Sequence, residues 1–283
     1  MTPAAQLASL LLEHLGIATK PDLRSLCKQL GLRIKEVPLT GAHGALVRSK
    51  NAPKGIISVK SSLPELAQKR FTVAHEIGHF IIPYHKNLGS VCDARALGRF
   101  SMSMPRAELE ANEFAAELLL PAKLVSAALQ LKSPSLETIS RVAADFDASL
   151  TATTWRYLDL TDQPCAMIWS HKGNASWYRT SDALPIQLPL QDLPAPQSIA
   201  GRLFAGKQPS GAGPIDPHLW FNAPDAENIQ ALIEDSLHIL RYNAVLTLLW
   251  ATGTNRLVAA EEEELLPELT PEEFSLGRKL WPR

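Results

Sequence analysis

The feature that most constrains this chain is a His-Glu-x-x-His pattern formed by His75, Glu76 and His79. On a helix, residues four positions apart lie on one face, so the two imidazoles would project side by side. That spacing lets both rings bind one zinc ion, and Glu76 can then reach the zinc-bound water as a general base. The pattern therefore predicts a helix that carries two zinc ligands and one acid–base residue.

The flanking sequence predicts that this helix runs from about residue 63 to residue 82. Ser62 and Glu65 form a Ser-x-x-Glu capping box, and the proline after Ile82 makes continuation unfavourable. Chance occurrence of the pattern is the alternative, but apolar residues stand on both sides of it. Buried polar groups need partners, and a metal ion supplies one. Gly78 costs helix stability, which indicates that another segment packs closely against it.

A catalytic zinc site needs a third protein ligand and an open position for water. His85 stands at the third histidine position of the metzincin pattern, but Ile82 occupies the place where that pattern requires glycine for a sharp turn. Acids on a second predicted helix, about residues 105–120, compete with it. Asn112, four residues after the first acid, is expected to support a ligand there. Spacing alone does not choose among these acids, which are Glu108, Glu110, Glu113 and Glu117.

Composition narrows the classes of function. The 283 residues are enough for two domains, and the 46% hydrophobic content can form a substantial core. Lys+Arg 28 against Asp+Glu 29 leaves a net charge of -1, so direct nucleic-acid binding is not indicated. Three widely spaced cysteines without a Cys-x-x-Cys pair indicate a reducing cytoplasm. No apolar stretch approaches the roughly 20 residues that span a bilayer, so we expect no membrane association.

The rest of the chain predicts a mixed α+β protein. A small N-terminal sheet, with strands at 32–37, 44–48 and 55–60, leads into the motif helix. After Thr161, turn signals predict a hairpin around Lys172-Gly173, a long irregular segment over 184–217, and a second hairpin over 229–250. A helix over 229–240 is the alternative for the first part of that second hairpin. We therefore expect a mainly helical unit over residues 1–160 and an α+β domain over residues 162–283. Further helices are expected at 4–15, 21–30, 121–131, 135–146 and 150–158.

Two segments in this order resemble the ImmA/IrrE family of bacterial metallopeptidases. They are Ala-His-Glu-Ile-Gly-His at 74–79 and Glu-Leu-Glu-Ala-Asn-Glu-Phe-Ala-Ala-Glu-Leu-Leu-Leu-Pro at 108–121. The resemblance covers about residues 5–160. It implies a zincin-like metallopeptidase domain in which zinc is bound by His75, His79 and Glu108, with Glu76 as the catalytic acid. Leu120 replaces the methionine usual in the family, and the interval between the two segments is somewhat long.

The same resemblance implies a zinc-dependent endopeptidase whose protein substrate is a regulatory protein, typically a helix-turn-helix repressor or antitoxin. Two other functions stay open: a non-hydrolytic zinc-containing regulator that binds protein or DNA, and a sensor built on residues 162–283. Glu76 favours hydrolysis, because binding alone does not need it. We expect the tryptophans after residue 160 to belong to a core rather than to a ligand cage; they are Trp169, Trp177, Trp220, Trp250 and Trp281.

Overall fold

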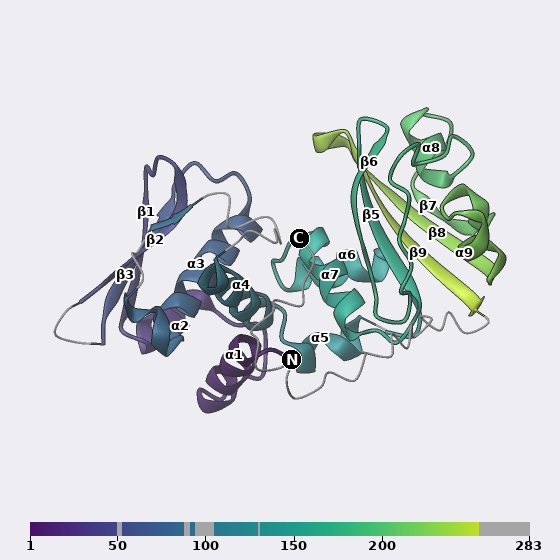
Figure 1. Ribbon diagram of the computed structural model, residues 1–283. Coiled ribbons are helices and arrows are strands. Elements are labelled where there is room, and N and C mark those ends of the chain that lie inside the picture. The colour runs from purple at the N-terminus through teal and green to yellow at the C-terminus, as the bar shows by residue number, and fades with distance from the viewer. Residues whose placement is uncertain (50–52, 88–90, 94–104, 130, 255–283) are drawn as a thin grey trace, which may run out of the picture.

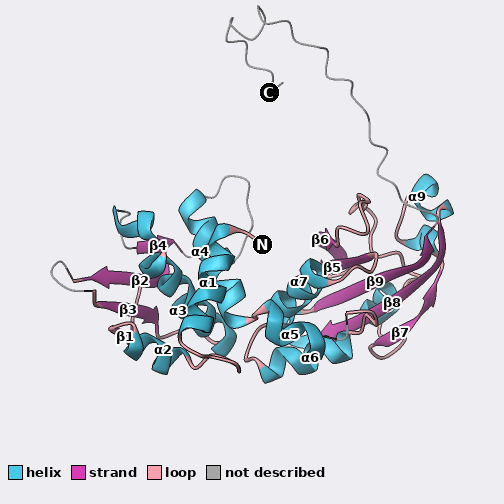
Figure 2. Ribbon diagram, turned by 90° about the horizontal axis from the view of Figure 1, so that it is seen from below, coloured by secondary structure: helices cyan, strands magenta, loops and turns pink. Residues whose placement is uncertain are grey.

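The computed structural model describes residues 1–49, 53–87, 91–93, 105–129 and 131–254. It has an α+β architecture with two sheets, as the sequence predicts. Figure 1 shows a half built from the first helices and a small sheet, and a second half built around a larger sheet. Helices α5, α6 and α7 lie between the N-terminal helices and the larger sheet in both ribbon views (Figure 2).

The N-terminal half packs helices against one face of a four-stranded sheet with strand order β1-β3-β2-β4. β1 runs parallel to β3, whereas β2 is antiparallel to both of its neighbours. Its elements are α1 (Pro3–His14), α2 (Leu23–Gln29), β1 (Leu32–Val37), β2 (Ala42–Arg48), β3 (Gly55–Lys60), α3 (Leu66–Ile81), η1 (Pro83–Asn87), β4 (Val91–Asp93) and α4 (Arg106–Leu119).

Helix α3 begins later than the sequence predicts. Its N-cap is Glu65, whose side chain makes no capping hydrogen bond, so the expected capping box with Ser62 is wrong. The reason is Leu63: the proline that follows it disfavours helical backbone at that position, and the helix can start only after the proline. The buried side of α3 includes Val73 and Ile77, which share one core with Phe114 of α4.

The C-terminal half is built on a five-stranded antiparallel sheet with strand order β6-β5-β9-β8-β7. Both predicted hairpins are confirmed. The predicted irregular segment, in contrast, contains helix α8 and strand β7. The elements are α5 (Ala122–Ala128), α6 (Leu136–Asp145), α7 (Leu150–Leu160), β5 (Cys165–His171), β6 (Asn174–Thr180), α8 (Ile199–Phe204), β7 (Gly211–Ile215), η2 (Pro217–Leu219), α9 (Ala223–Glu227), β8 (Ile229–Ile239), η3 (Leu240–Tyr242) and β9 (Ala244–Thr254).

The turn between β5 and β6 explains why the first hairpin could be predicted. Lys172 and Gly173 have φ angles of 51° and 82°. Two-residue hairpin turns of the tight primed type need positive φ at both central positions, and glycine adopts it without steric cost. The second hairpin uses Asn243, at φ 45°, for the same purpose.

The larger sheet is buried on both faces, because side chains alternate along β5. Cys165 and Met167 pack with α5, α6 and α7, whereas Ala166 and Ile168 pack with α8 and the fully buried Trp220. The cluster that contains Met167 also includes side chains from before residue 160, namely Val125, Leu129, Leu136, Ile139, Val142, Tyr157 and Leu158. Hydrophobic packing thus crosses the expected division at residues 160–162, and that division stays a prediction.

Most of the tryptophans pack in or against the two cores of the larger sheet. Trp169 and Trp177 stack with ring centroids 6.2 Å apart and rings 5° from parallel, and Trp155 meets Trp177 edge-on at 5.7 Å. These three rings and Trp250 are half-buried against the cluster beneath α7. Together with the buried Trp220, they fit the expected core role; Trp281 lies outside the described residues.

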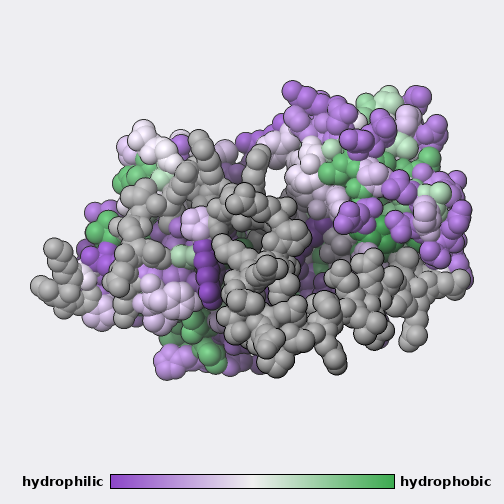
Figure 3. All heavy atoms as spheres, in the orientation of Figure 1, coloured by the Kyte–Doolittle hydropathy of each residue, from purple (hydrophilic) through white to green (hydrophobic). Residues whose placement is uncertain are grey.

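Two surface properties bear on function. On the face shown in Figure 3, hydrophilic residues cover much of the described surface, with hydrophobic patches on both halves. Within the described residues, no helix combines the length and apolar character needed to cross a membrane.

Candidate metal centre

Three predicted site residues come together between α3 and α4. His75 and His79 stand one turn apart on α3, and Glu108 lies in the first turn of α4. The two Nε2 atoms are 3.0 Å apart, and the Glu108 carboxylate oxygens lie 3.2 Å from His75 Nε2 and 3.4 Å from His79 Nε2. One potential ligand atom from each residue lies within 4.8 Å of the others. Two imidazole nitrogens and a carboxylate oxygen form a donor set that suits zinc.

Gly78 lets the two helices approach closely enough for this cluster to form. A Cβ atom at this position would lie 3.2 Å from Phe114 Cβ and 3.3 Å from Ala111 Cα, and both neighbours are fully buried. A larger side chain would therefore push α4 away from α3 and take Glu108 with it. This confirms the expectation that another segment packs against Gly78.

The carboxylate of Glu108 is strongly influenced by the two histidines. Burial by itself raises the pKa of Glu108, but His75 and His79 outweigh burial and bring the pKa to about 2. Glu108 is therefore an anion at neutral pH. A negative charge facing two imidazole nitrogens is favourable for binding a cation.

Each histidine of the cluster has a partner on its other ring nitrogen. His75 Nδ1 lies 2.8 Å from Asn112 Oδ1, which accepts a hydrogen bond from it. This contact places the proton on Nδ1 and leaves the Nε2 lone pair directed at the cluster. The sequence had suggested Asn112 as a partner for a ligand at Glu108, whereas the structure pairs it with His75.

His85 lies beside the three-residue cluster rather than in it. Its Nδ1 is 3.0 Å from His79 Nδ1, and its Nε2 is 3.1 Å from Glu110 Oε2. Burial lowers the pKa of His85, although its hydrogen bond to Glu110 opposes this effect. His85, which stands at the third histidine position of the metzincin pattern, thus contacts His79 of the cluster instead of joining the cluster. The extended backbone of Ile82, at ψ 118°, and the short helix η1 carry the chain there.

The other two acids of α4 lie outside the cluster. Glu117 accepts hydrogen bonds from Ser9 Oγ and from the Ala122 backbone N–H, and it forms an ion pair with Arg156. Glu113 is not part of the cluster of potential metal ligands. The structure therefore groups only Glu108, among the four acids weighed from the sequence, with the motif histidines.

Glu76 is fully buried directly after His75 on α3. Strand β2 passes beside its carboxylate at Gly44, where a Cβ atom would lie only 2.7 Å from Glu76 Oε1. Further along β2, the Arg48 guanidinium donates to the backbone carbonyl oxygens of His79 and Phe80 at the end of α3. Both contacts fix β2 against the motif helix.

Strand β4 was not predicted from the sequence. This strand pairs antiparallel with β2 at Ala42, Gly44 and Ala45, with an irregularity in register between Ala42 and Gly44. Part of the sheet edge beside Glu76 is therefore already paired with the chain itself. The three-residue length of β4, between residues outside the described range, offered no pattern to detect.

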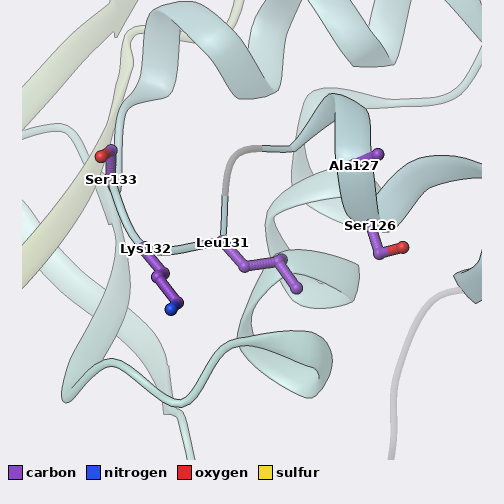
Figure 4. A pocket seen from close by; sticks show the side chains of 5 residues that line it. All are labelled: Ser126, Ala127, Leu131, Lys132 and Ser133. Carbon is purple, nitrogen blue, oxygen red and sulfur yellow. The ribbon is translucent and has the colours of Figure 1, made fainter.

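A hollow on the surface differs in its lining from the three-residue cluster. It is an open depression of about 500 Å³ beside α5, lined by Ser126, Ala127, Leu131, Lys132 and Ser133 (Figure 4). This lining includes no carboxylate, imidazole or thiol. It therefore lacks the groups that would make a second metal centre.

Together, the fold and the cluster define a metallopeptidase-like domain with a possible metal-binding triad. Residues 27–156 match the peptidase M78 family model, described as the IrrE N-terminal-like domain. This match over part of the chain confirms the resemblance found in the sequence.

Comparison with solved structures gave a match along most of the chain. A protein titled Mycobacterium tuberculosis transcriptional regulator is similar with a TM-score of 0.51 and 18% sequence identity, over 89% of this chain and 88% of that chain. At this identity the likeness concerns the fold alone. The comparison with curated proteins gave no match.

Proposed function

We propose that this protein is a zinc-dependent endopeptidase that hydrolyses a peptide bond in a regulatory protein. The observation that carries the proposal is the cluster of His75, His79 and Glu108, with Glu76 next to it on the same helix. A zincin-type site needs two imidazoles at this spacing, a third ligand and an adjacent carboxylate, and the chain supplies all four groups. The family match supports the same class of reaction.

In this proposal, each residue has a distinct task. Zinc held by His75, His79 and Glu108 would supply Lewis-acid polarisation of the scissile carbonyl and would acidify water. Glu76 accepts a proton from the attacking water and later delivers it to the leaving amine. The close passage of Gly44 keeps the Glu76 carboxylate in one place, which is favourable for a group that must transfer a proton over a short distance.

For the substrate, we propose a helix-turn-helix repressor or an antitoxin, cleaved in the cytoplasm to release transcription. The likeness in fold to a protein titled as a transcriptional regulator supports a regulatory setting. We further propose that residues 162–283 have a regulatory role, because every candidate ligand and the proposed base lie before them.

The proposed reaction is tested by comparing the zinc-loaded full chain with its Glu76→Gln variant. Both are incubated with a helix-turn-helix protein encoded beside this gene and with an unfractionated cell extract, and new N-termini are identified by mass spectrometry. Cleavage should occur only with the unaltered chain and should stop when a chelator is added. Glu76→Gln should keep zinc but lose cleavage by several orders of magnitude. Equal cleavage by both proteins would refute the role of Glu76.

A second candidate is a non-hydrolytic regulator or sensor that acts by binding protein or DNA. The observation that favours it is that the regulator of similar fold matches along both halves of the chain and not only along the peptidase-like half. The Glu76→Gln variant separates the two candidates in cells. A binding regulator would keep its effect on transcription with glutamine at this position, whereas a peptidase would lose it.

A further inference from the structure

The contacts of His85 form a continuous line of polar groups that leads outward from the candidate metal centre. His79 Nδ1 lies 3.0 Å from His85 Nδ1, His85 Nε2 lies 3.1 Å from Glu110 Oε2, and Arg106 Nε lies 2.9 Å from Glu110 Oε1. The side chains of His79 and His85 are almost fully buried, whereas Arg106 is 88% exposed. The line therefore connects a buried imidazole with the protein surface.

The donors and acceptors along this line fit only one arrangement when His79 binds a metal through Nε2. His79 must then carry its proton on Nδ1, which donates to His85 Nδ1. His85 must carry its own proton on Nε2, which donates to the Glu110 carboxylate. Arg106 supplies the charge that balances Glu110. Every polar group in the line is satisfied in this arrangement, as buried polar groups require.

The two cluster histidines are thus supported in different ways. His75 meets the amide oxygen of Asn112, which can only accept a hydrogen bond and so selects the Nδ1-protonated form of His75 directly. His79 instead meets the imidazole of His85. The Glu110 carboxylate, on the other side of His85, decides which nitrogen of His85 is protonated. A neutral imidazole without such a partner could present Nδ1–H to His79, and the two donors would then face each other.

We propose that His85 and Glu110 are positioning residues: the Glu110–His85 pair holds the proton of His79 on Nδ1 and directs His79 Nε2 at the metal. This inference rests on the metal site of the proposed function. It assigns to His85 a role that differs from that of a ligand. It also predicts that zinc affinity depends on residues that do not touch the metal.

The test measures zinc affinity by competition with a chelator for the full chain and four variants. His85→Ala removes the acceptor for His79, and Glu110→Gln removes the charge that orients His85. Each should weaken zinc binding about 10- to 100-fold, as is typical for partners of metal-bound histidines. His85→Asn keeps an oxygen close to the place of His85 Nδ1 but cannot reach Glu110, so its affinity should fall between that of the full chain and that of His85→Ala.

Glu113→Gln is the matched control, because it removes a carboxylate from the same helix outside the cluster and should leave zinc affinity unchanged. Unfolding of each metal-free variant, together with the visible spectrum of each cobalt-loaded variant, separates positioning from loss of fold. The proposal expects similar metal-free stability for Glu110→Gln and Glu113→Gln, with a changed cobalt spectrum only in the former.

Two results would overturn the proposal. If His85→Ala and Glu110→Gln bound zinc as tightly as the full chain, the pair would have no positioning role, while the proposed metal site would stand. If the unaltered chain itself bound no zinc, both the positioning role and the proposed function would fall.

Discussion

Gly44 shows how a single residue can set the geometry around a proposed catalytic group. The strand β2 passes so close to α3 that a Cβ atom at this position would lie 2.5 Å from Thr72 Cγ2 and 2.7 Å from Glu76 Oε1. Contacts this short do not occur between well-packed atoms. Glycine is therefore needed here for close approach, and its placement determines where the Glu76 carboxylate can lie.

Replacing Gly44 with alanine should displace Glu76 or β2 and lower peptidase activity at least about tenfold, because small misplacements of a catalytic group are costly. Zinc should remain bound, since the three atoms nearest to the added methyl group belong to Thr72 and Glu76 and not to a candidate ligand. Gly213→Ala is a matched control: it also places alanine in a strand, but the nearest atom would lie 3.8 Å away. Turnover and zinc content would be measured for both variants. Unchanged turnover in Gly44→Ala would show that the close approach is not needed for catalysis.

At this scale, residue types and spacing were enough to predict that the two motif histidines meet, but not which acid joins them or which outer partners they have. The spacing of His75 and His79 follows from helical geometry, and the choice of Glu108 came from the family resemblance. The pairing of His85 with Glu110 could not be predicted, because it depends on where η1 places the chain after Ile82. Asn112 was expected to matter, yet its partner depends on the rotation of α4 about its own axis.

Among the elements, α4 connects the two halves of the molecule. Its first turn supplies Glu108, and its last turn supplies Glu117, which is 2% exposed and pairs with Arg156 of α7. Arg156 also donates to the Leu120 backbone carbonyl at 2.8 Å. Both ends of α4 are thus fixed by polar contacts, and the candidate metal centre is connected through α4 to the packing of α7.

Arg156→Ala should destabilise the fold by about 3–5 kcal/mol, because it leaves the buried Glu117 carboxylate without its cationic partner. The double variant Arg156→Met with Glu117→Gln should cost less, since no uncompensated charge remains and glutamine can still accept from Ser9 and Ala122. Lys69→Ala is the control, as it removes a solvent-exposed pair with Glu36 and should change stability by less than about 1 kcal/mol. Denaturant unfolding measures all three. A double variant less stable than Arg156→Ala would contradict this account.

The elements themselves were largely predictable because their signals are local. Hairpin turns need positive φ, and the sequence marked one of them with Lys172-Gly173. The start of α3 was wrong because the capping pattern around Ser62 competes with the backbone restriction before proline. Strand β7 and helix α8 were missed, because glycine- and proline-rich sequence gives little periodic signal and only packing against β8 and β9 defines them.

On the scale of the whole molecule, the described residues form three hydrophobic cores rather than one for each of the two expected domains. The first joins α1, α2, α3 and α4 with the small sheet, and another joins α5, α6 and α7 with the larger sheet. Polar contacts bridge the halves, including Lys20 with Asp147 at 2.9 Å and Arg241 with Glu65. The sequence predicted a domain boundary near residue 160, but side chains before that residue pack on the larger sheet.

A fragment that ends at residue 160 should therefore be less stable than the full chain. It lacks the sheet face that covers Ile139 and Tyr157, and each large apolar side chain exposed in this way costs about 1.5–3 kcal/mol. The fragment should melt at a lower temperature and bind a hydrophobic dye. If it melts like the full chain and binds no dye, residues 1–160 form an independent domain, as the sequence first suggested. Its cleavage rate relative to the full chain then tests the proposed regulatory role of residues 162–283.

The central claim is that His75, His79 and Glu108 hold one zinc ion, and the most direct test is the metal content of the purified protein. Elemental analysis after dialysis against a weak chelator should give about one zinc per chain for the full protein, the usual occupancy of a three-ligand site. Glu108→Ala and His79→Ala should both lose most of it, while Glu113→Gln should retain it. Full zinc content in Glu108→Ala, or none in the unaltered chain, would contradict the account.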